Sequence, residues 1–181
     1  MKIKSKLVLN FGILILLSIL IVGINFITFT NMESDSSFVN QAGTLRAMNF
    51  KMAKLSNQVV SSENPSANEG LENTMAQFEQ TLKDVTEGNE ELSLEKPTME
   101  NTIVGLEQIN KRWTEEFKPA ALNVLNSSSE KDLEFINSNV DDFVSQINEV
   151  VKEYSNYSLA KVMKAKFINI VLVVIAIIIG I

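Results

Sequence analysis

The sequence predicts an all-α protein: an antiparallel, up-down-up-down four-helix bundle whose first and fourth helices are continuous with two transmembrane helices. The 181-residue chain is 45% hydrophobic, and an uncharged apolar run lies near each end. Between these runs, apolar residues recur at intervals of three and four, with few β-strand signals. Short polar connections between successive amphipathic helices favour antiparallel neighbours, which gives the bundle topology.

The first apolar run predicts a membrane-spanning helix near the N-terminus. Residues 7–29 are uncharged and mostly Leu, Ile, Val and Phe. At about 1.5 Å per residue they exceed the roughly 30 Å of a bilayer core. A secretory signal peptide is the alternative, but its apolar region is usually about 7–15 residues long, and no alanine precedes Ala42 to form a cleavage site. We therefore expect an uncleaved anchor.

The second apolar run, residues 167–181, is shorter than the roughly 20 residues that a spanning helix needs. We interpret it as a transmembrane helix truncated before its far flank. Lysines favour the cytoplasmic side of a membrane, so those at positions 2, 4 and 6 favour a cytoplasmic N-terminus. The lysines at 161, 164 and 166 oppose this positive-inside rule, because they would lie on the outer side. Long loops translocate largely regardless of charge, so the first signal dominates. The expected two-pass order in the plasma membrane is cytoplasmic 1–6, transmembrane 7–29, extracytoplasmic sensor domain 30–166 and transmembrane 167–181.

Four amphipathic stretches follow one another in the segment between the runs. A polar, proline-containing turn at residues 61–68 separates the first two. The predicted core positions are Phe38, Leu45, Met48, Met52, Leu55 and Val59; then Leu71, Met75, Phe78, Leu82 and Val85; then Ile103, Leu106, Ile109, Trp113, Phe117, Ala120 and Val124; and finally Leu133, Ile136, Val140, Phe143, Ile147, Val150 and Tyr154.

Helix boundaries in the second half of this segment can also be predicted. Residues 86–96 form a polar break, after which Pro97 suits the first turn of the third helix. Pro119 falls inside the third stretch and should kink it. Ser129 and Asp132 have the spacing of a capping pair at the start of the fourth helix.

Composition excludes most familiar chemistry. The chain has no His and no Cys, which removes the commonest general base and both common zinc ligands. No glycine-rich loop is present to hold a phosphate. A net charge of −6 disfavours nucleic acid as a partner. A narrow bundle also offers little concave space, so we predict no enzyme, no catalytic residue, no metal and no cofactor.

A basic region stands out in this acidic segment. No acidic residue lies between Asp35 and Glu63, and the interval contains Arg46, Lys51 and Lys54. At about 100° per residue, Arg46 lies opposite the first core stripe. Small and apolar residues surround it on a second face, namely Val39, Ala42, Gly43, Phe50 and Ala53.

This second face predicts a homodimer interface. A helix with two apolar faces is usually packed on both sides, and in a two-fold dimer such a face meets itself. Two Arg46 guanidinium groups would then approach each other and would need an anion between them. A small planar oxyanion accepts forked hydrogen bonds from both, with Lys51 adding positive potential. The alternative is an ordinary solvated arginine whose stem lies on its neighbours.

Residues 39–53 read VNQAGTLRAMNFKMA and resemble the IN-x-AG-x-LRM-x-S-x-RMA element of the PilJ/NarX-type sensor domain. The chain departs from the element at Ala47, Asn49 and Lys51. Trp113 is similar to the family's third-helix tryptophan. The matching positions are Asn40, Ala42, Gly43, Leu45, Arg46, Met52 and Ala53.

The resemblance implies a dimeric extracytoplasmic bundle in a bacterial transmembrane receptor. It implies an anion bound by Arg46 at the dimer interface, with Gly43, Asn40 and Lys51 as candidate neighbours. Close helix packing through Gly43 and Ala42 is the structural alternative. We expect the ligand-sensing, membrane-spanning part of a methyl-accepting chemotaxis receptor, partnered by a cytoplasmic signalling module whose pattern is not found in these residues. The alternatives are a nitrate/nitrite-type histidine kinase sensor and a non-signalling membrane-anchored scaffold.

Overall fold

The computed structural model describes residues 3–61 and 64–180, which fall into two compact units. One unit, the bundle, is Asp35–Ser155; the other, the apolar pair, is drawn from Met1–Ser34 and Asn156–Ile181. Lys2, the first lysine of the predicted basic N-terminus, lies outside the described residues, as do positions 62 and 63 of the predicted turn.

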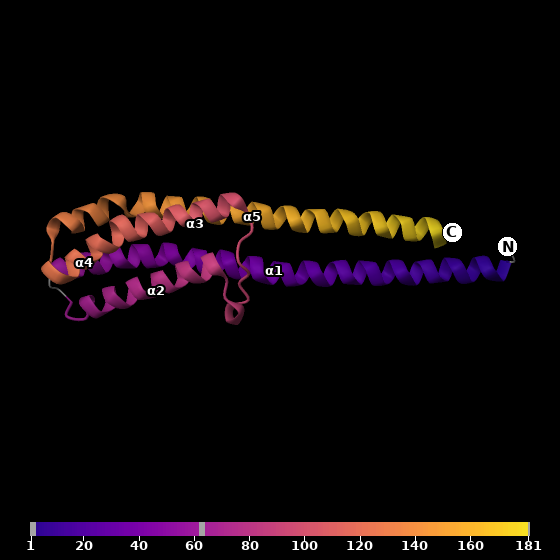
Figure 1. Ribbon diagram of the computed structural model, residues 1–181, viewed down its shortest axis with the longest axis horizontal. Helices are drawn as coiled ribbons and strands as arrows, with labels where there is room; N and C mark the ends of the chain where they lie inside the picture. The colour runs from indigo at the N-terminus through magenta and orange to yellow at the C-terminus, as the bar shows by residue number, and fades with distance from the viewer. Residues whose placement is uncertain (1–2, 62–63, 181) are drawn as a thin grey trace. The chain divides into compact units, whose positions relative to one another are not determined.

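The bundle consists of four helical rods that run alternately up and down, which confirms the predicted fold class (Figure 1). The first and fourth rods belong to long helices that contribute residues to both units, and the third rod contains an internal π-helical turn. The elements are α1 (Ile3–Ser61), α2 (Ala67–Glu87), the 3₁₀ turn η1 (Glu90–Leu92), α3 (Glu100–Arg112), the π turn η2 (Trp113–Phe117), α4 (Lys118–Ser127) and α5 (Glu130–Gly180).

The predicted apolar stripes form the core of the bundle, with one exception. All five predicted positions of α2 are buried, and rings from three rods stack at the centre, where the Phe117 and Phe143 centroids lie 4.4 Å apart. The prediction for Ile103 was wrong: its side chain is 37% exposed, and the neighbouring Thr102 is buried instead. α3 is rotated so that the smaller Thr102 side chain faces the core. On this side α3 lies close to α5, since a Cβ on Gly105 would contact Val150.

Pro119 does not end the third rod. Proline lacks an N–H, and its ring would collide with the carbonyl of Glu115, four residues earlier, in a regular α-helix. The chain relieves this conflict with the π turn η2, in which the Lys118 N–H bonds to the Trp113 carbonyl, five residues back. Regular α-helix then resumes at α4.

The two predicted helix starts have different outcomes. At α5, the Asp132 N–H donates to Ser129 Oγ over 3.3 Å, which confirms the capping pair. At α3, the helix begins at Glu100, so the prediction that Pro97 lies in its first turn was wrong. Pro97 and Leu94 are buried, and this packing holds the connection extended as far as Met99.

The apolar pair has the features of a membrane-spanning segment. Both α1 and α5 are long and apolar enough to cross a bilayer, and their most apolar windows are almost wholly exposed. Within this unit, Asn169 Nδ2 donates to Asn25 Oδ1 over 2.8 Å. Such a bond joins two helices where lipid offers no competing partner.

Candidate functional site

Arg46 lies on the surface of the bundle, where it connects two helices. Its Nη1 donates to the side-chain Oδ1 of Asn148 over 2.6 Å. Arg46 is on α1 and Asn148 is on α5, 102 residues further along the chain. A guanidinium–amide bond of this length is a strong, charge-assisted hydrogen bond, so it fixes the direction of the arginine side chain.

Gly43 provides the space that this arginine occupies. The side chain folds back along α1, so that a Cβ built on Gly43 would lie 2.9 Å from Arg46 Nη2. The residue three positions before an arginine lies beside it on a helix, and only glycine leaves that space open. Gly43 therefore decides where the Nη2 corner of the guanidinium lies.

One edge of the guanidinium remains available. An arginine has two forked edges, and the side-on edge consists of Nε and Nη2. Asn148 takes Nη1, and within residues 3–61 and 64–180 neither atom of the side-on edge has a hydrogen-bond or ion-pair partner. A planar oxyanion could accept two parallel hydrogen bonds there.

The structure divides the predicted dimer face into two parts. Ala42 and Ala53 are 1% and 7% exposed and belong to the core of the single chain. They are covered because α5 lies against this side of α1, as the Arg46–Asn148 bond shows. Phe50, by contrast, is 47% exposed. The part of the predicted face that the single chain does not fully bury contains the exposed Phe50 and the partly buried Val39, Gly43 and Arg46.

The remaining predicted ligand residues lie on α1 without contact to Arg46 in the described contacts. Asn40 is exposed, and its backbone carbonyl accepts the hydroxyl of Thr44 at 3.0 Å. Lys51 is exposed as well, and Lys54 lies on the next turn. These two lysines therefore add positive potential near Arg46 without being part of the guanidinium site.

Two further polar links join α1 to α5 inside the bundle. Asn57 and Asn137 exchange amide hydrogen bonds at 2.9 and 3.2 Å, three helical turns beyond Arg46. At the other end, the Tyr154 hydroxyl donates to Asp35 Oδ1 over 2.9 Å in a buried setting. Like the Arg46–Asn148 bond, both of these links join a side chain of α1 to a side chain of α5.

A second polar cluster joins α2 to the third rod. Glu79 accepts from Lys118 Nζ at 2.6 Å and from Trp113 Nε1 at 3.0 Å. Burial alone raises the pKa of Glu79, but the bonds from Lys118 and Trp113 and the charge of Lys118 together lower this pKa below its ordinary value of 4.5. The cluster is an ion pair with a structural function.

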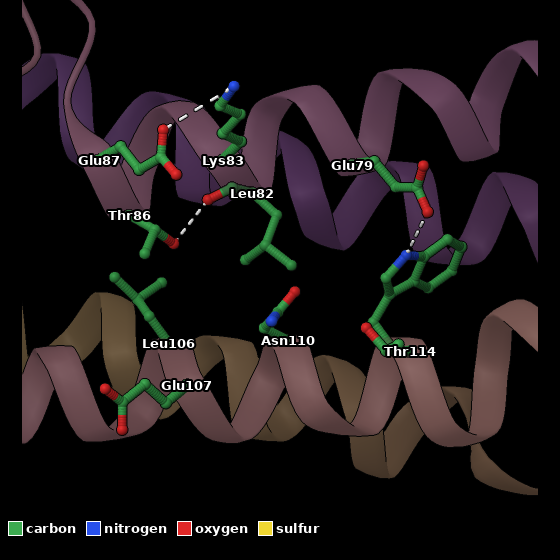
Figure 2. A pocket seen from close by; sticks show the side chains of 10 residues that line it. Glu79, Leu82, Lys83, Thr86, Glu87, Leu106, Glu107, Asn110 and Thr114 are labelled. Atoms are coloured by element: carbon green, nitrogen blue, oxygen red, sulfur yellow. Dashed lines mark hydrogen bonds and ion pairs between the residues drawn. The ribbon is translucent and has the colours of Figure 1, made fainter.

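Beside this cluster, residues of α2, α3 and η2 line a half-open cavity of about 290 Å³ (Figure 2). The sequence predicts little concave space, and this cavity is at the small end of the range for ligand pockets. Three carboxylates and one lysine line it, and that lysine, Lys83, faces Glu87 at 3.9 Å. An excess of negative charge disfavours an anion here. The lining residues are Glu79, Leu82, Lys83, Thr86, Glu87, Leu106, Glu107, Asn110, Trp113 and Thr114.

Sequence reasoning selected Arg46 and Gly43 as candidate site residues and did not select Asn148, Glu79 or Lys118. The first two are neighbours on one helix, so their proximity follows from helical spacing. The other three act across helices, and only the register of the bundle brings them to their partners. No metal-ligating group of three acidic, His or Cys side chains occurs among the positions that the structure describes.

Comparisons with known proteins agree with this architecture. The family described as "Type IV pili methyl-accepting chemotaxis transducer N-term", or PilJ, matches residues 27–143, more than half of the chain. Among solved structures, the ligand-binding domain of the P. aeruginosa nitrate receptor McpN has a similar fold, with a TM-score of 0.61 and 21% sequence identity. The match covers 67% of this chain and 96% of the McpN domain. No match to a curated protein was found.

The fold and the flanking apolar helices define a receptor-type sensor bundle. The chain belongs to the PilJ family of methyl-accepting chemotaxis transducer N-terminal domains. It thus carries a sensor domain of the chemotaxis-transducer class, and the two apolar helices support a location in a membrane. The matched family and the McpN domain are both described as parts of receptors or transducers, and neither description names an enzyme.

Proposed function

We propose that this chain is the ligand-sensing and membrane-spanning part of a bacterial methyl-accepting chemotaxis receptor that responds to a small planar oxyanion such as nitrate. The observation that carries the proposal is the guanidinium of Arg46. It is partly buried at the surface of an acid-free region in an acidic domain, it is held by Asn148, and its side-on edge has no partner among the described residues. The likeness of the fold to the nitrate receptor McpN supports nitrate as the first anion to test.

The same proposal includes a homodimer. A lone exposed arginine binds a monovalent anion weakly because water competes for both, whereas two guanidinium groups around one anion exclude that water. Val39, Gly43 and Phe50 would surround the paired arginines with small and apolar surface. The exposed ring of Phe50 supports a partner at this position, since burying it would be favourable.

The proposal further includes a signal that passes along α1 and α5 to a cytoplasmic module. Each of these helices contains one candidate membrane span. The domain order is the one predicted from sequence: cytoplasmic residues 1–6, spans at 7–29 and 167–181, and an extracytoplasmic domain at 30–166. An anion that alters the contact between α1 and α5 would change the position of both helices.

Thermal unfolding of the full chain in lipid nanodiscs tests the proposal. Nitrate, nitrite and chloride are each titrated, and a ligand at 100 times its dissociation constant should stabilise the fold by about 2.7 kcal/mol. Arg46→Ala should keep the fold and lose this stabilisation. Arg112→Lys, a change in the chain's other arginine, is the matched control and should keep it. Stabilisation by none of the three anions, or full stabilisation of Arg46→Ala, would contradict the proposal.

A further inference from the structure

We infer that Asn148 on α5 is a positioning residue for the anion site: it holds Arg46 by Nη1 so that the side-on edge of the guanidinium is presented to a planar oxyanion. The inference rests on the function proposed above and extends it to a second helix. Nothing in the sequence motif around Arg46 points to Asn148, which lies 102 residues away.

The first step in the argument is the geometry of the guanidinium. It has five N–H donors arranged in a plane, and the Nε and Nη2 edge matches two oxygens of a planar anion. A free arginine side chain samples many rotamers, so that edge points in no fixed direction. The 2.6 Å bond to Asn148 Oδ1 removes this freedom by fixing the opposite corner of the plane.

The second step is that the residue at 148 is neutral. An aspartate would form an ion pair with Arg46, and its negative charge would cancel the potential that attracts an anion. An amide oxygen binds one corner of the guanidinium and leaves the full positive charge for the ligand. Gly43 completes the arrangement, because the open space above it admits Nη2.

The third step concerns selectivity. A fixed fork favours a planar anion with two oxygens in the right spacing over a spherical anion of equal charge. A mobile guanidinium attracts both by charge alone. Asn148 should therefore raise the preference for nitrate over chloride, in addition to raising nitrate affinity.

The experiment measures nitrate and chloride binding to the full chain in nanodiscs by calorimetry. Asn148→Ala should weaken nitrate binding about tenfold and reduce the nitrate-to-chloride ratio, and Asn148→Asp should weaken it further. Asn137→Ala is the matched control, since Asn137 is also an α5 asparagine that bonds to a side chain of α1, Asn57. Its nitrate affinity and anion ratio should equal those of the wild type.

A spectroscopic readout separates positioning from a general structural effect. The chain has only two arginines, Arg46 and Arg112, so nitrogen-15 labelling of arginine gives two Nε–H signals. Nitrate should move the Arg46 signal in the wild type, move it much less in Asn148→Ala, and leave the Arg112 signal unchanged in both. Wild-type nitrate affinity and anion ratio in Asn148→Ala would overturn the inference while the proposed function stands. Absence of nitrate binding in the wild type would instead overturn the proposed function, and with it the inference that Asn148 is a positioning residue.

Discussion

Replacing Gly43 by alanine should stabilise the bundle and weaken nitrate binding at the same time. Gly43 lies in the interior of α1, where glycine costs about 0.5–1 kcal/mol relative to alanine. The added Cβ would meet Arg46 Nη2 at 2.9 Å, and among the described residues no side chain from another helix lies within 4 Å of it. Because that contact is the far end of a flexible side chain, the arginine moves aside and the core does not shift.

The loss in binding follows from the same contact. Displacing Nη2 removes one of the two charge-assisted bonds of the fork, each worth about 1.5–3 kcal/mol. For each arginine that contacts the anion, this corresponds to a roughly 10- to 150-fold higher dissociation constant for nitrate. The gain in stability corresponds to an increase in unfolding temperature of roughly 1–4 °C for a chain of this size. The two effects thus have opposite signs and are measured on one sample, by thermal unfolding and by calorimetry.

Gly105→Ala is the matched control, because it makes the same chemical change in another helix. A Cβ on Gly105 would collide with Val150 Cγ2 in the contact between α3 and α5. Overpacking of this kind costs about 1–3 kcal/mol, so this variant should be less stable with unchanged nitrate affinity. Unchanged affinity in Gly43→Ala would refute the assignment of Nη2 to the fork, and a loss of stability in Gly43→Ala would show that Gly43 serves close helix packing instead.

Three other predictions concern the fold and the topology. Because the folded-state pKa of Glu79 lies below its unfolded value, the Lys118 pair stabilises the protein above about pH 4.5, and this contribution is lost as pH falls through the folded-state pKa. Unfolding curves at several pH values should show that Glu79→Gln loses less stability in acid than the wild type, and equal losses of stability would contradict the ion pair. Tyr154→Phe removes the hydroxyl bonded to the buried Asp35 carboxyl, so denaturant unfolding should show a loss of about 1–3 kcal/mol, with no change if the bond is absent in solution. The chain has no cysteine, so Glu91→Cys should react with a membrane-impermeant maleimide on intact cells or spheroplasts; protection until lysis would place the bundle in the cytoplasm.

Local sequence patterns were sufficient for the helical architecture. Apolar residues at intervals of three and four specify which side of each helix is buried, and this holds for every predicted core position of α2. The capping pair at Ser129 and the proximity of Gly43 to Arg46 are also local, since each involves residues three apart on one helix. Such features depend on backbone geometry alone and need no knowledge of the neighbouring helices.

The tertiary structure decided which faces are covered and which residues meet across helices. Helical spacing places Ala42 and Ala53 beside Arg46, but only the position of α5 shows that these alanines are buried while Arg46 reaches the surface. The partner of Arg46 at position 148 likewise depends on the register between α1 and α5. A sequence period determines the angular position of a residue on its own helix, whereas the rotation and sliding of one helix against another are set by packing over the whole core.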